Sequence, residues 1–231
     1  MKMNKYFFIV FVVFFTLSSG NVFAAGKSGP TEQLKPVMND LLQVLADEGL
    51  KGEHHFVERR AKIMKIISLV FDFREMSKRI LGKTWRKLSD DDRDNFTRLM
   101  TKLLENVYVG KLETYSGQTI DFDGERVKGH RAQVTTLVED GGHIIPIHYI
   151  MRERGSRWFV YDINIEGVGL VKNYHEQFKS ILRKEKYKGL VKVLEEKNRS
   201  FARPAKGQAT ETDKNQDRKN NKNRTVEQGK E

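Results

Sequence analysis

Few side chains in this sequence have the setting that catalysis needs, and Asp162 is the strongest candidate. It interrupts an apolar run between Tyr161 and Ile163, so a strand would carry it close to the core. A buried carboxyl can act as a general base, as in cone-shaped α+β isomerases and dehydratases. An acid that accepts hydrogen bonds from arginine or from backbone N–H groups fits the same position better. We therefore predict no catalytic residue, and an enzyme that uses Asp162 remains the alternative.

Metal and nucleotide chemistry has little support in the sequence. No histidine pair has the spacing of a helical zinc motif, and no glycine-rich phosphate loop or nucleophile elbow is present. The chain has no cysteine, which excludes thiol chemistry and zinc–thiolate sites. Asp90, Asp91 and Asp92 are expected at the start of a helix, where carboxylates complement exposed N–H groups. We predict no metal site and no cofactor.

The overall charge favours acidic partners. The chain has 42 Lys and Arg against 31 Asp and Glu, a formal net charge of +11 at pH 7. Such a balance suits nucleic acid, anionic lipid or an acidic protein surface. The basic residues are scattered and are not interleaved with an aromatic strand motif, so we predict no nucleic-acid binding.

The two ends of the chain differ in composition from the middle. Lys2 and Lys5 precede an apolar run over 6–17, and small residues lead to Ala24, which is typical of a secretory signal peptide over 1–24. A spanning helix would need roughly 20 apolar residues. Residues 202–231 are polar and are expected to be disordered, because they have too little apolar area to bury. One domain over 25–201 remains.

The first half of that domain has the periodicity of helices. Apolar residues recur at helical spacing over 34–45, 54–70 and 89–107, and Gly49 is expected to end the first helix. Asp72 with Glu75 predicts a capping box that opens a short helix ending at Gly82. Ser89 with Asp92 repeats this pattern before the long helix.

Beyond Tyr115 the apolar pattern predicts strands, then a helix. Strand-like runs are separated by Asp123-Gly124, by Asp140-Gly141-Gly142 and by Gly155-Ser156, the residue pairs of hairpin turns. A helical pattern returns over 168–194. The prediction is an α+β fold with N-terminal helices, a four-stranded antiparallel meander and a C-terminal helix.

The last predicted strand suggests a cavity. Residues 158–165 place apolar groups on both faces, so the sheet is either sandwiched or lines an apolar space. Large, flexible apolar residues are frequent in the helices, where they are typical of a core and would also suit a cavity for long chains. We predict an apolar pocket between the sheet and the helices.

Several segments in order resemble one family, the phospholipid-binding proteins of the Mla pathway (MlaC, or the toluene-tolerance family). The resemblance covers roughly residues 34–195 and rests on Phe71-Asp72-Phe73-Arg74-Glu75-Met76, Leu81-Gly82-Lys83-Thr84-Trp85-Arg86, Leu112-Glu113-Thr114-Tyr115-Ser116-Gly117, Ile145-Pro146-Ile147-His148-Tyr149, Trp158 to Val168, and Leu170 to Phe178. Gly169 stands where the family usually has serine.

The resemblance implies a function and its partners. It implies a periplasmic, monomeric carrier that catalyses no reaction and holds phospholipid as cargo. Such a carrier shuttles lipid between outer- and inner-membrane complexes and maintains outer-membrane lipid asymmetry. The inner partner would be an ABC transporter with an MCE-type ring protein, and the outer partner a lipoprotein–porin complex. A protein-interaction module with a solid core is the other alternative.

Alternation and family position together give the candidate site residues. The predicted lipid-binding residues are Val70, Phe73, Met76, Ile80, Phe96, Met100, Leu103, Val107, Ile147, Tyr149, Met151, Trp158, Val160 and Ile163. The predicted contacts to the headgroup or to an acidic partner are Lys83, Arg86 and Lys172.

Overall fold

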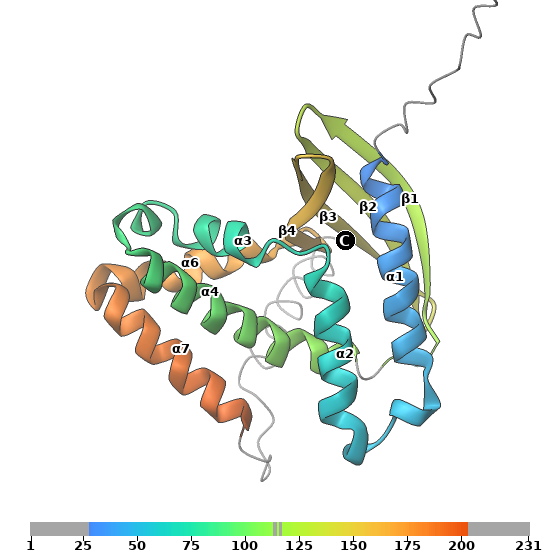
Figure 1. Cartoon of the computed structure of the whole chain (residues 1–231), viewed down its shortest axis with the longest axis horizontal. Helices are drawn as coiled ribbons and strands as arrows, with labels where there is room; N and C mark the ends of the chain where they lie inside the picture. The colour runs from blue at the N-terminus through green and yellow to red at the C-terminus, as the bar shows by residue number, and fades with distance from the viewer. Residues whose placement is uncertain (1–27, 113–114, 116, 203–231) are drawn as a thin grey trace, which may run out of the picture.

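The computed structural model describes residues 28–112, 115 and 117–202, so the expected signal peptide and nearly all of the expected tail lie outside them. Within these residues, the helices over 73–104 and 170–202 lie on one side of the molecule, and a twisted antiparallel sheet with the first helix packed along it lies on the other (Figure 1). The predicted α+β class is confirmed.

The N-terminal half is helical, as the apolar periodicity predicts. Its elements are α1 (Pro30–Ala46), η1 (Glu48–Leu50), η2 (Glu53–His55), α2 (Phe56–Ser68), α3 (Phe73–Leu81), η3 (Thr84–Lys87), α4 (Asp90–Leu104), the π-helical η4 (Glu105–Val109) and α5 (Gly110–Leu112).

The predicted caps are present at α3 and α4. An Asp72 carboxylate oxygen accepts a hydrogen bond from the Glu75 backbone N–H at 2.9 Å, and Ser89 Oγ accepts one from the Asp92 N–H at 3.2 Å. Gly82 follows the last residue of α3 with a φ of +54°, a conformation that favours glycine. These local signals therefore give the correct ends of α3 and the correct start of α4.

The predicted end of the first helix is wrong by a few residues. α1 stops at Ala46, and the Asp47 carboxylate accepts the Gly49 N–H at 2.9 Å. This side-chain bond starts the short turn η1, so Gly49 lies inside η1 and does not terminate α1.

The sheet has five strands, and the prediction of four is corrected. The strands are β1 (Thr119–Lys128), β2 (Arg131–Asp140), β3 (His143–Arg154), β4 (Arg157–Ile165) and β5 (Val168–Gly169), which pair antiparallel in chain order. Glu166 and Gly167 both have positive φ and make a tight turn. That turn lets Val168 pair with Ile165 before the next helix begins.

The hairpin predicted at Asp123-Gly124 does not exist. Both residues lie inside β1, and the pairing with β2 shifts between Phe122 and Gly124, as in a β-bulge. A glycine within a strand commonly marks such a bulge. The chain turns instead at Gly129 and His130. The turns predicted at Gly141-Gly142 and at Gly155-Ser156 are confirmed.

The predicted C-terminal helix is two helices. α6 spans Leu170–Lys184 and α7 spans Lys186–Ala202. Lys186 has a φ of +61°, so the helical path is broken and α7 packs back against α4 as well as α6 (Figure 1). The Tyr187 hydroxyl donates to the Asp92 carbonyl oxygen at 2.6 Å and fixes the start of α7 to the start of α4.

Two large apolar clusters hold these elements together. The helical cluster joins α3, α4, α6 and α7 around buried residues that include Met76, Phe96 and Phe178. The sheet cluster joins α1 to β2, β3 and β4 around residues that include Leu34, Val134 and Met151. A smaller cluster connects α1 to α2.

Candidate functional site

The predicted lipid-binding residues divide between the two large clusters. Met76, Ile80, Phe96, Met100 and Leu103 are buried in the helical cluster, with Phe73 and Val107 partly buried against it. Val70, Tyr149, Met151, Trp158 and Val160 are buried in the sheet cluster, with Ile147 partly buried against it. The helices and the sheet therefore present two separate apolar surfaces.

Two residues contact both clusters. Ile163 on β4 and Phe71, between α2 and α3, are partly buried against the helical cluster and also against the sheet cluster. The Val160 N–H donates to the Val70 carbonyl oxygen and the Asp72 N–H donates to the Val160 carbonyl oxygen, both at 2.8 Å. These bonds fix the segment that carries Phe71 to the β4 backbone. We call Phe71 and Ile163 the junction pair.

Sequence reasoning included Ile163 and missed Phe71. The segment Phe71-Asp72-Phe73 did carry a signal, because two aromatic residues flank a helix cap. The Phe71 and Phe73 rings stack with their centroids 5.2 Å apart. Only the pairing of this segment with β4 shows that Phe71 also reaches the sheet.

The predicted lipid-binding residues differ in how much of their side chain is accessible to solvent. Most of the predicted set is buried, and Met151, Val160, Ile80 and Phe96 are fully enclosed. The half-buried members are Phe73, Val107, Ile147 and Ile163. A ligand can reach only side chains with accessible surface, so these four and Phe71 are the best candidates for direct contact with a ligand.

The strand register places the sheet candidates on one face. Tyr149 pairs with Ile163, and Ile147 lies two residues before Tyr149 on β3. Side chains two apart on a strand, and directly paired side chains, share a face. This is the face that α1 covers through Leu34 and Met38. The candidate surface is thus the inner face of the sheet, next to the helical cluster.

The candidate residue Val107 lies in the π-helical turn η4, which continues α4. Residues Glu105–Val109 form this turn, and single π-turns inside α-helices are frequent at functional sites. Arg60 donates to the Glu105 carbonyl oxygen at 3.1 Å, which ties α2 to the turn. Burial raises the pKa of the Tyr108 and Tyr174 phenols, which also influence each other.

The buried acid Glu75 fastens α3 to the sheet beside the junction pair. Its carboxylate lies 2.9 Å from the Arg79 guanidinium and 3.2 Å from that of Arg152 on β3. Arg154 makes a second ion pair across the same boundary, 3.0 Å from Asp72. Arg152 and Arg154 therefore join the sheet to the start of α3.

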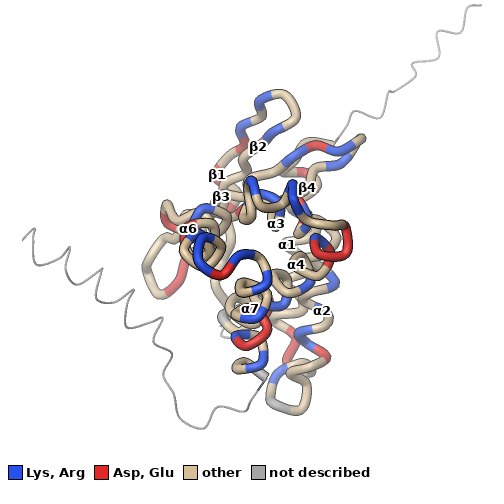
Figure 2. Tube along the Cα trace, turned by 90° about the vertical axis from the view of Figure 1, so that its left-hand side faces the viewer, with Lys and Arg blue, Asp and Glu red and all other residues tan. Residues whose placement is uncertain are grey.

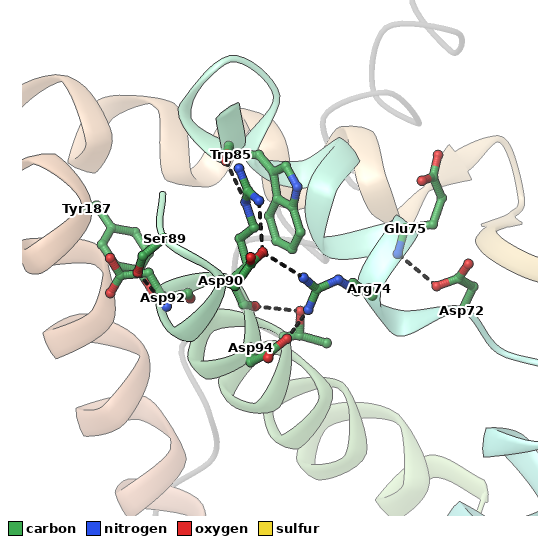
Figure 3. Close-up of polar contacts among 11 residues, drawn as sticks. Asp72, Arg74, Glu75, Trp85, Ser89, Asp90, Asp92, Asp94 and Tyr187 are labelled. Atoms are coloured by element: carbon green, nitrogen blue, oxygen red, sulfur yellow. Dashed lines mark hydrogen bonds and ion pairs between the residues drawn. The ribbon is translucent and has the colours of Figure 1, made fainter. Parts of the chain in front are cut away.

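The acidic start of α4 has a structural role (Figure 3). Arg74 contacts Asp94 and lies 3.4 Å from Asp90, and Arg93 lies 2.9 Å from Asp90. Arg74 and Arg93 also lie over the Trp85 ring, with guanidinium-to-centroid distances of 5.6 and 5.7 Å. This network explains the acidic run as a helix start that holds η3 in place.

Asp162 is placed to stabilise the start of α6. Its carboxylate accepts the Val171 N–H at 3.0 Å, while Gly169, the residue that precedes α6, has no side chain to do so. Burial raises the pKa of Asp162, and the hydrogen bond from Val171 opposes that rise. These contacts favour a structural acid.

We expect the structural role of Asp162 to appear as a stability difference between two variants. Asp162→Asn keeps an oxygen acceptor for the Val171 N–H, and Asp162→Ala removes it. The free energy of unfolding of the alanine variant should be about 1 kcal/mol lower than that of the asparagine variant, as for the loss of a helix cap. Urea unfolding followed by circular dichroism measures this difference, and equal midpoints would contradict the capping role.

The pH dependence of the same pair gives a second expected result. A carboxyl with a raised pKa binds its proton more readily in the folded chain than in the unfolded chain. The unfolding free energy of the wild type, relative to Asp162→Asn, should therefore rise as pH falls through the folded pKa to the ordinary value of 3.8. A relative stability that falls over this range would show that the pKa is lowered.

The predicted headgroup or partner contacts are exposed. Lys83 precedes η3, Arg86 lies within it, and Lys172 lies in the first turn of α6. None of the three makes an ion pair or side-chain hydrogen bond with the residues that the structure describes. They are available for a ligand, but they belong to different elements and form no preorganised site.

The depression with a volume of about 410 Å³ between α1 and α2 is a different kind of site. It is lined by Asp40, Gln43, Val44, Asp47, Leu50, Lys62 and Ile66. None of the predicted lipid-binding residues borders it, and its polar lining does not suit an acyl chain.

The described residues contain neither a group of metal ligands nor a membrane-spanning helix. Over 28–112, 115 and 117–202, no three acidic or histidine side chains are grouped closely enough to hold a metal ion. No helix in that part of the chain has the length and apolar character to cross a bilayer.

Comparison with known proteins places these observations in a family. The family model described as MlaC protein matches residues 35–196. The intermembrane phospholipid transport system binding protein MlaC of Haemophilus influenzae is 23% identical over 124 residues, which cover 51% of this chain and 58% of that protein. The toluene tolerance protein ttg2D of Pseudomonas putida is 26% identical over 123 residues, which cover 52% and 57%. The matches thus span little more than half of these relatives.

A solved structure shares the fold. The phospholipid-binding protein from Ralstonia solanacearum, solved in complex with a phospholipid, superposes with a TM-score of 0.70 at 24% sequence identity. The match covers 76% of this chain and the whole of the other one. At this identity the likeness establishes a shared fold.

Proposed function

Because this chain belongs to the MlaC protein family, we propose that it is a phospholipid carrier that catalyses no reaction. The observation that carries the proposal is the junction pair, two half-buried apolar residues that contact the helical cluster and the sheet cluster at once. An acyl chain inserted beside them would be shielded from water on both sides. The family membership and the phospholipid held by the structural relative support this choice of cargo.

The free energies involved suit a carrier. Burial of one methylene group is worth about 0.8 kcal/mol, so two chains of roughly 16 carbons represent on the order of 25 kcal/mol against water. A lipid therefore needs an apolar cover to cross an aqueous space. Bilayer and carrier both supply hydrocarbon surroundings, so modest differences in docking contacts can decide between loading and release.

In this proposal the half-buried candidates make the direct contacts with the acyl chains. They are Phe73, Val107, Ile147, Ile163 and the added residue Phe71, while the enclosed residues form the walls behind them. Lys83, Arg86 and Lys172 would meet the phosphate or an acidic partner. No cofactor takes part, and the phospholipid is cargo.

We further infer the cellular setting. Residues 1–24 would be removed as a signal peptide, 25–201 would form the lipid-binding domain in the periplasm, and 202–231 would be a polar tail. The carrier would exchange lipid with an inner-membrane ABC transporter that has an MCE-type ring and with an outer-membrane lipoprotein–porin complex. The names of the relatives, which refer to intermembrane phospholipid transport and toluene tolerance, support this setting.

Mass spectrometry of gently purified protein tests the proposal. The protein, processed by the cell, is expected to retain phospholipid at close to one molecule per chain under native conditions, and denaturation should release the lipid. An empty protein after gentle purification, which also fails to take up phospholipid from vesicles, would overturn the carrier function. That outcome would favour an interaction module with a solid core.

A further inference from the structure

Four exposed cations surround the turn between α6 and α7. Arg183 and Lys184 end α6, and Lys186 and Lys188 lie in the first turn of α7. Among the residues that the structure describes, none of the four has an acidic partner, and Glu185 is the one acid in the segment 183–192. We call these four cations the basic turn.

The basic turn is held rigidly at one end of the molecule. The Tyr187 hydroxyl bonds the Asp92 carbonyl oxygen at 2.6 Å, and its ring centroid lies 6.5 Å from that of buried Phe96. Figure 2 looks onto this end and shows the α6–α7 turn lined with Lys and Arg, close to the segment between α3 and α4. The acidic start of α4 is also near: Asp90 and Asp94 are paired with arginines, and burial together with the Asp92 carboxylate raises the pKa of Tyr187.

Lys186 places a cation in a backbone conformation that favours glycine. Its φ of +61° lies in the left-handed region, where the residue after a helix is usually glycine. A side chain in this region is strained. Lys186 Nζ donates to the Arg183 carbonyl oxygen at 3.2 Å, so the lysine also satisfies the end of α6 while it keeps a cation in the turn.

The character of the surface favours a membrane over a protein partner. Stable protein interfaces have an apolar core with aromatic anchors. Among the residues with a described position, the large exposed apolar ones are Phe56, Val57, Leu69, Val127, Ile144, Val168 and Phe201, and none lies in 183–188. Flexible lysines without fixed geometry instead suit a diffuse anionic surface.

We propose that the basic turn docks the protein on a bilayer surface of anionic phospholipid. The inference rests on the proposed function, because a carrier must approach the membrane that supplies or accepts its cargo. Basic residues near an anionic bilayer each strengthen binding by about fivefold, and salt weakens this attraction. Docking through the basic turn would bring the helical end of the molecule to the membrane.

Co-sedimentation with vesicles tests the docking. The full chain, as processed by the cell, is mixed with vesicles of phosphatidylcholine alone or with added phosphatidylglycerol, at low and at high salt. Wild-type protein should bind only the vesicles that contain phosphatidylglycerol, and less at high salt. The triple variant Arg183→Gln, Lys184→Gln, Lys188→Gln should bind on the order of a hundredfold more weakly, at about fivefold per charge.

A second triple variant controls for net charge. Arg126→Gln, Lys128→Gln, Arg131→Gln removes three exposed cations, which have no ion pair among the described residues, from the β1–β2 hairpin. This control should bind vesicles almost as the wild type does. The proposal would be overturned if the two triple variants lost vesicle binding equally, or if the substitutions in the basic turn left vesicle binding unchanged. Wild-type protein that binds an acidic protein but no vesicle would also overturn it.

The test separates docking from cargo binding. Vesicle docking and co-purified phospholipid are measured on the same samples. Docking through the basic turn by a protein that holds no lipid would support this inference and contradict the carrier function. A lipid-loaded protein whose vesicle binding is unchanged by the substitutions in the basic turn would support the carrier function and contradict this inference.

Discussion

Replacing Phe96 by alanine is expected to lower the free energy of unfolding by about 3–5 kcal/mol, as for other fully enclosed aromatic residues. Phe96 is 0% exposed at the point where α4 meets α6 and α7. Its ring stands edge-to-face against Phe178, with centroids 6.4 Å apart. Alanine would leave a cavity that three helices must collapse to fill. Chemical unfolding, followed by far-ultraviolet circular dichroism, measures the loss.

A phenylalanine at the surface provides the matched control. Phe201 near the end of α7 is 39% exposed, and Phe201→Ala should change stability by less than about 1 kcal/mol. A small effect at Phe96 would show that the helical cluster is loosely packed. That result would contradict the description of Phe96 as part of a rigid wall.

Replacing Ile163 by tryptophan is expected to abolish most of the bound phospholipid while the fold survives. Ile163 belongs to the junction pair and is half-buried, so we expect the larger ring to compete with an acyl chain for the apolar surface between the two clusters. Displacing two or three methylene groups removes about 2 kcal/mol of apolar burial, enough to weaken the affinity for the lipid at least tenfold, so that most of it is lost during purification. Lipid extracted from purified protein and quantified by mass spectrometry gives the occupancy.

The control for this experiment lies on the other face of the same sheet. Ile150 on β3 is also half-buried, but it is paired with Asp162 and belongs to neither large cluster. Ile150→Trp should therefore retain the phospholipid of the wild type. Loss of lipid from both variants would indicate a general effect on the sheet. Full occupancy in Ile163→Trp would exclude the junction pair as the site of cargo.

Local sequence signals predicted the ends of some helices correctly, but one of them predicted a hairpin turn where the structure has a bulge. The caps at Asp72 and Ser89 depend on groups only three residues away, so the sequence contains all that is needed. Asp123-Gly124 carries an equally strong local signal for a turn. The pairing with β2 makes it a bulge, and that pairing depends on residues more than ten positions away.

In the candidate site, too, some features follow from the local sequence and others depend on distant contacts. Alternation along the strands and family position predicted which residues are apolar and inward-facing, and Ile147, Tyr149 and Ile163 do share the covered face. Periodicity could not separate residues that are enclosed in the core, such as Met151, from residues that keep accessible surface. That distinction depends on how neighbouring elements pack, and Phe71 was missed for this reason.

Periodicity, caps and motifs are local properties, so they were enough to predict the α+β class, the order of the main helices and strands, and a resemblance that the family model confirms. Tertiary structure decided the rest: the fifth strand, the division of the last helix at Lys186, and the meeting of two apolar clusters at Phe71 and Ile163. These features arise from contacts between segments far apart in the chain, and such contacts depend on how all the elements fit together.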